Sequence, residues 1–253
     1  KNANEKAVID QSRNEVRKAL AAIPLYFHAL AQKSKDKALY EKALTRYLEF
    51  SQKFPEDKWH NYEFSYYRAE IYNSLGDYEK SAQFYNSVAM ADLSTFGPYK
   101  PEIDTLGMDQ PAIEKQKKEE KTGPITISQE DAGYNAVVAL MKARKKAMAK
   151  GGVGDEQSFN LPETKRLLDY IHKYQARFPK SVNAAELSFV GADLFYTSKM
   201  YSEAIREYKI VIDSYGDTKF GPKALRMIAN CYVNTGDFDL ALAKYKEILK
   251  KTQ

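Results

Sequence analysis

Histidine and cysteine, the residue types that most often ligate transition metals or act as nucleophiles, are few in this sequence. His28, His60 and His172 fall in three different predicted helical segments and lack the spacing that puts two histidines on one helix face. We expect them to be exposed or packed side chains. Cys231 is the only cysteine, which excludes an intramolecular disulfide, and its apolar helical surroundings predict a buried thiol. The sequence therefore predicts no catalytic residue and no metal site.

The glycine-rich stretch at 151–154 is the one segment whose composition suggests phosphate binding. A phosphate-binding loop needs a preceding strand and a following Lys-Ser/Thr pair, and the sequence offers neither. The stretch is predicted to be a hinge between two helices. No nucleophile-elbow or paired-carboxylate pattern stands out from the surface acids either, so we expect no cofactor.

A basic cluster at Arg144, Lys145, Lys146 and Lys150 is the densest of its sign. A solvated helix face explains it, and contact with anionic lipid headgroups or an acidic partner is the alternative. The whole chain carries 39 basic and 34 acidic side chains, for a net charge of +5, with the signs interspersed. Because nucleic-acid binding requires a continuous basic surface, we expect no nucleic-acid partner.

A recurring pattern of small and aromatic residues indicates how the chain is built. Around Gly236-Asp237, alanines and aromatic residues recur at intervals of three or four on both sides, which predicts two amphipathic helices folded back on each other. The aromatic that follows this turn, Phe238, has counterparts at Tyr40, Tyr78 and Tyr201. These positions are separated by 38 residues in the first half and 37 in the second, a period typical of helical repeats.

The repeated spelling Ala-x-x-Tyr-x-x-x-Gly-Asp-Tyr/Phe resembles the tetratricopeptide repeat. It occurs at 69–85 and 229–245, and again at 192–208 with Lys199 in place of the turn glycine. The resemblance implies an all-α fold, a right-handed superhelical solenoid of about five antiparallel helix pairs with an insertion after the second. It also implies a binding scaffold that performs no catalysis.

The organisation that this pattern predicts has six parts. They are N-terminal helices with a first degenerate repeat (1–57), a second repeat (58–92), a Pro-, Gly- and Lys-rich insertion (93–129), an expanded third repeat (130–181), a fourth (182–218) and a fifth (219–253). One short helix is expected inside the insertion, over 111–121.

Several residues predict where helices begin and end. Gly76 should adopt a positive φ after the first helix of the second pair, with Asp77 capping the next helix and Ser128 capping another. Pro24 is expected to kink or restart the N-terminal helix. Phe54-Pro55 and Phe178-Pro179 each end a helix on an aromatic residue.

The resemblance also implies which side chains line a concave groove, because the first helix of each pair faces it in this family. By helical phase, the predicted partner-binding residues are Glu63, Tyr66, Glu70 and Asn73 in the second pair, Glu186, Phe189, Asp193 and Tyr196 in the fourth, and Lys223, Arg226, Asn230 and Asn234 in the fifth. Two repeats thus offer acidic and aromatic side chains, whereas the last offers basic and amide ones. A partner peptide with basic or apolar side chains suits this groove.

These features predict a non-catalytic protein–protein interaction scaffold or adaptor; a regulatory or accessory module of an enzyme complex is the alternative. Repeats longer than the usual length of about 34 residues, with Phe-Pro after the second helix, are similar to bacterial cell-envelope members of the family. These are the lipoprotein of outer-membrane β-barrel assembly and the periplasmic Tol-Pal coordinator. The resemblance implies a periplasmic or outer-membrane-associated protein, with the cytoplasm as the alternative.

The two ends of the chain bear on its partners. No apolar run is long enough to span a membrane, but the first residue is Lys1, which leaves open a removed leader or a lipid tether. The last predicted helix presents Leu242, Ile248 and Leu249 without a polar helix to cover them. We expect a further segment, a contact between two copies or a partner protein at that face.

Overall fold

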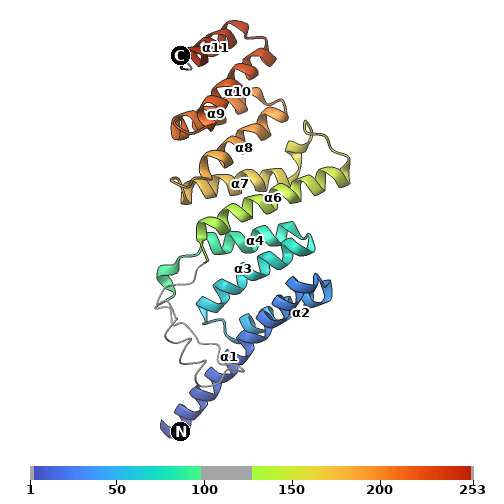
Figure 1. Cartoon of the computed structure of the whole chain (residues 1–253), viewed down its shortest axis with the longest axis vertical. Coiled ribbons are helices and arrows are strands. Elements are labelled where there is room, and N and C mark those ends of the chain that lie inside the picture. Colours follow the sequence, from blue (N-terminus) through green and yellow to red (C-terminus); the bar gives the residue numbers. More distant parts are fainter. Residues whose placement is uncertain (1–2, 98–126, 252–253) are drawn as a thin grey trace. The chain divides into compact units, whose positions relative to one another are not determined.

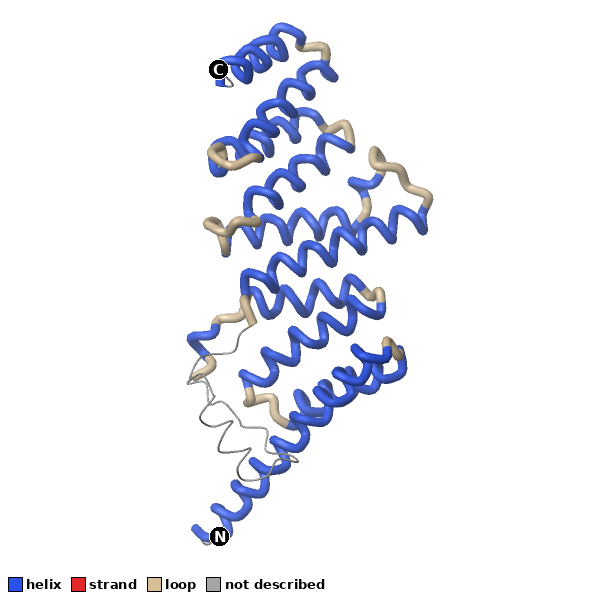
Figure 2. Tube along the Cα trace, viewed as in Figure 1, coloured by secondary structure: helices blue, strands red, loops and turns tan. Residues whose placement is uncertain are grey.

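The computed structural model describes residues 3–97 and 127–251, and every regular element in these ranges is helical. Ten α-helices and two short 3-10 helices follow one another along the described chain. Figures 1 and 2 show these helices joined by short turns and loops. The predicted all-α fold of paired helices is confirmed. The predicted helix at 111–121 and most of the insertion lie outside the described residues. The chain divides into two compact units, 1–132 and 133–253.

The first unit contains two antiparallel helix pairs. These are α1 (Ala3–Ser34) with α2 (Lys37–Lys53), and α3 (Lys58–Leu75) with α4 (Tyr78–Ala89). A 3-10 helix, η1 (Leu93–Thr95), follows α4, and the first turn of α6 (Gln129–Gly151) also belongs here. Aromatic side chains dominate the core, with Tyr47, Phe50 and Phe64 almost fully buried. Their large buried surfaces supply most of the apolar stabilisation of this unit.

Pro24 lies inside α1, which continues from Ala3 to Ser34, so the predicted restart of the helix at this proline is wrong. A proline removes only one helical hydrogen bond, and the helix around it is held by tertiary packing. Ala21 and Ala31 are buried in the core on either side of the proline, and Phe27 packs against that core. Contact with neighbouring helices therefore outweighs the local cost of the proline.

The turns that join paired helices follow the sequence pattern. Gly76 has a φ of 75°, and the side chain of Asp77 accepts a hydrogen bond from the Lys80 backbone N–H, as predicted. In the repeat that lacks a glycine, Lys199 takes the same left-handed conformation, with a φ of 60°. The turn geometry is thus kept even where a side chain makes it unfavourable.

The two Phe-Pro sites end their helices in nearly the same way. Phe54 has φ and ψ of −130° and 59°, and Phe178 has −129° and 56°. Each backbone N–H still donates to the carbonyl oxygen four residues earlier, that of Phe50 or Tyr174. The following proline then prevents another turn of helix.

The second unit contains the rest of α6 and five further helices. They are α7 (Pro162–Arg177), α8 (Ala184–Thr197), α9 (Tyr201–Tyr215), α10 (Phe220–Thr235) and α11 (Phe238–Lys251), with η2 (Ser158–Asn160) before α7. Each helix from α7 to α11 packs on the next. Gly133 lets α6 approach α7 closely, because a Cβ atom there would lie 2.9 Å from Cδ2 of Tyr174.

The core between α8, α9 and α10 combines small and large side chains. Ala192, Ala204 and Ala224 are completely buried, and Tyr208 fills the space beside them. Cys231 belongs to this core, as predicted, and burial raises the pKa of its thiol to about 11. A protonated, buried thiol of this kind is unreactive.

The last helix carries apolar side chains on its surface. Phe238, Leu242 and Leu249 are 67%, 52% and 63% exposed, whereas Ile248 is half-buried. The predicted exposure of Leu242 and Leu249 is therefore observed, and what covers them stays a prediction. Within the described ranges, no helix has the length and hydropathy needed to cross a membrane.

Candidate functional site

One face of α3 carries four of the predicted partner-binding residues, Glu63, Tyr66, Glu70 and Asn73. Their spacing of three and four residues places them in one row along the helix. All four are half-buried rather than fully exposed. We refer to these four residues as the α3 face.

Tyrosine rings from neighbouring helices surround this face. The ring of Tyr66 meets that of Tyr85 from α4 at a centroid distance of 5.2 Å, edge to face. Tyr67, the next residue on α3, lies 6.3 Å from Tyr47 of α2. The glutamates of the α3 face therefore lie among aromatic rings contributed by three helices.

Burial perturbs the carboxylates of the α3 face. It raises the pKa of Glu70, and it raises the pKa of Glu63 against an opposing effect of His60. Within the described chain, neither carboxylate receives a hydrogen bond or forms an ion pair. Burial and the glutamate charges together also raise the pKa values of the Tyr47 and Tyr85 hydroxyls. The α3 face is thus a partly desolvated negative site whose carboxylates form no ion pair within the described chain.

His28 lies behind this face, against the rings of Tyr40, Tyr47 and Tyr67. It is only 5% exposed, its Nδ1 lies 3.3 Å from the Tyr47 hydroxyl, and its Nε2 has no partner. Burial lowers its pKa to about 4, so the ring is neutral at physiological pH. As the sequence predicted, this histidine is a packed side chain.

In the second unit, some of the predicted residues of α8 are exposed, and others contact side chains of neighbouring helices. Glu186 is exposed, whereas Phe189 packs against the rings of Tyr208 and Phe220. Asp193 accepts a short hydrogen bond from the Tyr208 hydroxyl. Burial raises the pKa of Asp193, and this hydrogen bond opposes the rise.

The predicted residues of α10 behave similarly. Lys223 and Arg226 are exposed. Asn230 accepts a hydrogen bond of 2.7 Å from the Tyr245 hydroxyl, and Asn234 donates one of 3.4 Å to the hydroxyl of Tyr196 on α8. Tyr196 and Asn234 therefore connect two repeats, whereas the Asn230 hydrogen bond to Tyr245 lies within one repeat.

A pairing that the sequence analysis missed recurs in three repeats. The residue after the buried alanine (Glu70, Asp193 or Asn230) lies near the tyrosine fifteen positions later, which is Tyr85, Tyr208 or Tyr245. The equal spacing in all three repeats was a visible signal. Helical phase assigns the first residue of each pairing to the groove and the tyrosine to the core. It does not predict a hydrogen bond between the two, because that bond depends on how the two helices pack.

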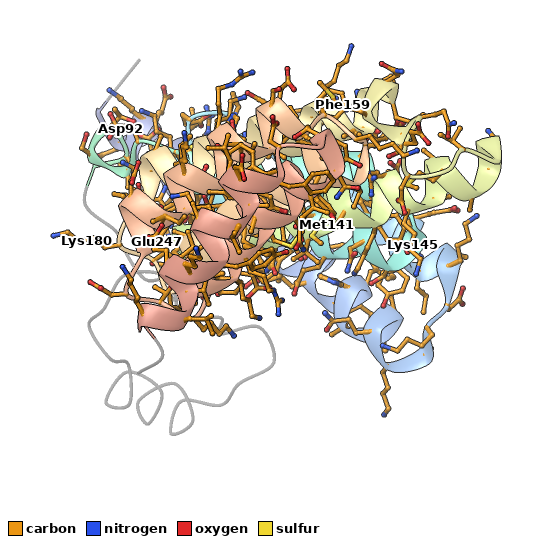
Figure 3. All side chains as sticks on the ribbon, turned by 90° about the horizontal axis from the view of Figure 1, so that it is seen from above. Asp92, Met141, Lys145, Phe159, Lys180 and Glu247 are labelled. Carbon is orange, nitrogen blue, oxygen red and sulfur yellow. The ribbon has the colours of Figure 1, made fainter. Side chains whose placement is uncertain are left out.

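The predicted basic cluster on α6 needs one correction. Arg144 is half-buried, and its guanidinium donates to Ser158 Oγ at 2.6 Å and to Thr164 Oγ1 at 3.1 Å. It anchors the segment between α6 and α7 and does not belong to an exposed patch. Lys145 and Lys150 are exposed, and Figure 3 labels Lys145 together with Phe159 of η2. The ring of Phe159 packs at 4.9 Å from that of Phe195 in α8.

The other two histidines, His60 and His172, each lie beside an acidic side chain. His60 Nδ1 lies 2.8 Å from Asp57 Oδ2, and Arg17 of α1 donates to the same carboxylate oxygen at 2.6 Å. Burial alone would raise the pKa of Asp57, but these bonds hold it at about 2. His172 Nε2 lies 3.8 Å from a carboxylate oxygen of Glu207, and this neighbouring carboxylate raises the pKa of His172. Among the described residues, no group of histidine, cysteine and acidic side chains is arranged to hold a metal ion.

Comparison with known proteins identifies the family. A tetratricopeptide repeat family model matches residues 28–98 and 190–253, which together are more than half of the chain. The chain belongs to the tetratricopeptide repeat family. The matched ranges contain α3 and α4 in the first unit, and most of α8 with α9 to α11 in the second.

Three solved structures are similar to this chain at low sequence identity. A crystal structure of MamA is 13% identical, with 92% of this chain and 91% of that chain covered and a TM-score of 0.45. A MamA fragment from Desulfovibrio magneticus RS-1 is 12% identical, with 90% and 93% covered and a TM-score of 0.39. The apo form of RapI is 13% identical, with 92% and 71% covered and a TM-score of 0.40. No curated protein matched the chain.

Proposed function

We propose that this chain is a protein–protein interaction scaffold that binds a segment of a partner protein along the α3 face. The tetratricopeptide repeat fold is generally non-catalytic and typically serves protein binding. The observation that carries the proposal is the pair of half-buried carboxylates, Glu63 and Glu70, which lie among tyrosines and form no hydrogen bond or ion pair within the described chain. Desolvated charge of this kind is a cost to folding that a bound partner can offset.

In the second unit, the predicted residues of α8 and α10 are proposed as a separate surface for a partner protein. Glu186, Lys223 and Arg226 are exposed there and available to a ligand. Two further predicted residues, Tyr196 of α8 and Asn234 of α10, contact each other across these helices. A rigid surface made from packed repeats favours binding because little side-chain freedom is lost on association.

The experiment that tests this function compares charge reversal at the α3 face with charge reversal elsewhere in the same unit. Glu63→Lys plus Glu70→Lys should abolish crosslinking to a partner in cells of the source organism. Glu5→Lys plus Glu41→Lys changes the net charge equally at two exposed positions and should leave the crosslink intact. Circular dichroism of both purified variants checks that they are folded. Equal capture by wild type and by the folded α3-face variant would refute the proposal.

We also propose a bacterial cell-envelope setting, in the periplasm or at the outer membrane. The support is the resemblance of the Phe54-Pro55 and Phe178-Pro179 repeat ends to envelope members of the family, together with the shared geometry of the two ends. Fractionation of source cells tests the setting directly. Recovery of the full-length protein in the cytosolic fraction alone would contradict it.

A further inference from the structure

Three repeats of this chain offer an internal comparison at one position, the residue after the buried alanine of the first helix. It is Glu70 in the first unit, and Asp193 and Asn230 in the second. In the second unit both side chains are satisfied from within, because Tyr208 donates to Asp193 and Tyr245 donates to Asn230. The recurrence shows that the repeat can supply its own donor at this position.

Glu70 is the exception. Tyr85, fifteen residues later, is the counterpart of Tyr208 and Tyr245. Burial and then the charge of Glu70 raise the pKa of its hydroxyl. In the described part of the chain, however, no hydrogen bond joins Glu70 to Tyr85 or to any other residue. The half-buried carboxylate of Glu70 therefore has no hydrogen-bond donor in the described chain, whereas the equivalent side chains each accept a hydrogen bond from a tyrosine.

The groups nearest to Glu70 form no hydrogen bond or ion pair with it in the described part of the chain. The Tyr47 hydroxyl lies 3.3 Å from His28 Nδ1, and the other nitrogen of that 5%-exposed ring is buried without a partner. Arg68, the basic residue nearest in sequence, lies over the ring of Phe84 at 4.1 Å, and no ion pair joins it to Glu70 in the described part of the chain. The cation closest along the helix therefore does not neutralise Glu70.

The surroundings of Glu70 have the chemistry that a cationic side chain needs. Glu63 adds a second half-buried carboxylate two helical turns earlier, and the rings of Tyr66 and Tyr85 meet beside them. Carboxylates form charge-assisted hydrogen bonds with ammonium and guanidinium groups, and aromatic faces attract the same cations. The same unit already holds a lysine on an aromatic ring, since Lys42 lies 4.2 Å from the ring centre of Phe27.

We propose that Glu70 and Glu63, with the rings of Tyr66 and Tyr85, bind the cationic end of a lysine or arginine side chain of the partner segment. This inference rests on the proposed scaffold function and names the chemistry of its ligand. The equivalent positions in the second unit differ, because Tyr208 already donates to one carboxylate oxygen of Asp193, and Asn230 carries a neutral amide that accepts from Tyr245. The net charge of the chain is +5, so general electrostatic attraction does not favour a basic peptide.

The test measures binding of short, capped, fluorescent peptides by anisotropy. The probes alternate alanine with arginine, with lysine or with glutamine, and the protein is wild type, Glu70→Gln or Glu41→Gln. The arginine and lysine probes should bind wild type more tightly than the glutamine probe, and Glu70→Gln should weaken them about tenfold. Glu41→Gln removes the same charge from an exposed residue of the same unit and should have little effect. Equal affinity of wild type and Glu70→Gln for the basic probes would overturn the proposal.

A second measurement follows the site directly. The Glu70 carboxylate, observed by NMR in protein with labelled glutamate, should show a lower pKa once the arginine probe is bound, because a cation favours the ionised form. An unchanged Glu70 pKa at saturating probe would contradict the inference. Partner crosslinking that is lost in the Glu63→Lys, Glu70→Lys variant but kept in Glu70→Gln would remove the cation site and leave the scaffold function standing.

Discussion

Replacing three equivalent tyrosines by phenylalanine should give three different losses of stability. Tyr208 is completely buried and donates to the half-buried carboxylate of Asp193, so Tyr208→Phe leaves that charge without a donor. We expect a loss of about 1.5–3 kcal/mol, the range for a hydrogen bond to a charged group. Tyr245→Phe removes a bond to the neutral amide of Asn230 and should cost about 0.5–1.5 kcal/mol.

The third member of the series, Tyr85→Phe, is expected to be almost neutral. Its hydroxyl has no hydrogen bond to Glu70, so its removal should cost less than the lower limit of about 0.5 kcal/mol for one lost hydrogen bond. The predicted order of destabilisation is therefore Tyr208, Tyr245, Tyr85. It depends on contacts between helices, since all three tyrosines occupy the same place in the repeat pattern.

Urea unfolding followed by circular dichroism measures these losses, with each resolved transition fitted separately because the chain has two units. A double-mutant cycle of Tyr208→Phe with Asp193→Ala isolates the pair, and its coupling energy should account for most of the Tyr208→Phe effect. The reasoning is refuted if Tyr85→Phe is as destabilising as Tyr208→Phe. That outcome would mean that Glu70 is satisfied internally after all, and it would also weaken the proposed cation site.

Three further predictions concern packing and pH. Because burial lowers the pKa of His28 from 6.5 to about 4, the stability that its neutral form contributes is fully present above pH 6.5 and is lost as the pH falls to 4. The loss in free energy of unfolding should be about 3 kcal/mol. Thermal melts of a His28→Gln variant should lack this pH dependence, and a stability profile identical to that of wild type would contradict the prediction. Gly133→Ala should destabilise the second unit by about 1–3 kcal/mol, because its Cβ would meet Tyr174, and an unchanged urea midpoint would show that the ring moves freely. Lys199→Gly should raise the melting temperature through a gain of about 0.5–1 kcal/mol by relieving a positive φ, and a lower melting temperature would count against this.

The order of helices and their pairing could be predicted from the sequence because they depend on local patterns. The spacing of small and aromatic residues predicted two-helix repeats, and Gly76-Asp77 marked a turn whose φ and cap are observed. Burial of Cys231 and Tyr208 also followed from helical phase. Periodicity reports which face of a helix is buried, and in repeats that face always meets the same kind of neighbour.

Two local expectations were wrong because neighbours outside the local sequence decide them. A restart of the helix at Pro24 is one expected outcome, but α1 continues from Ala3 to Ser34 because it packs against the core; the alternative, a kink at Pro24, stays a prediction. Arg144 was expected in an exposed cluster, but it reaches across a loop to Ser158 and Thr164. A long side chain can find hydrogen-bond partners many residues away, and helical phase alone does not reveal them.

The sequence by itself determined the repeat, the family and the row of residues on each first helix. Only the tertiary structure decided which of those residues are available to a partner. Asp193 and Glu70 occupy the same position in the repeat and both carry a carboxylate. Tyr208 donates a hydrogen bond to Asp193, whereas no hydrogen bond joins Tyr85 to Glu70. A hydrogen bond depends on distances of a few tenths of an ångström between two packed helices, and a one-dimensional pattern does not record such distances.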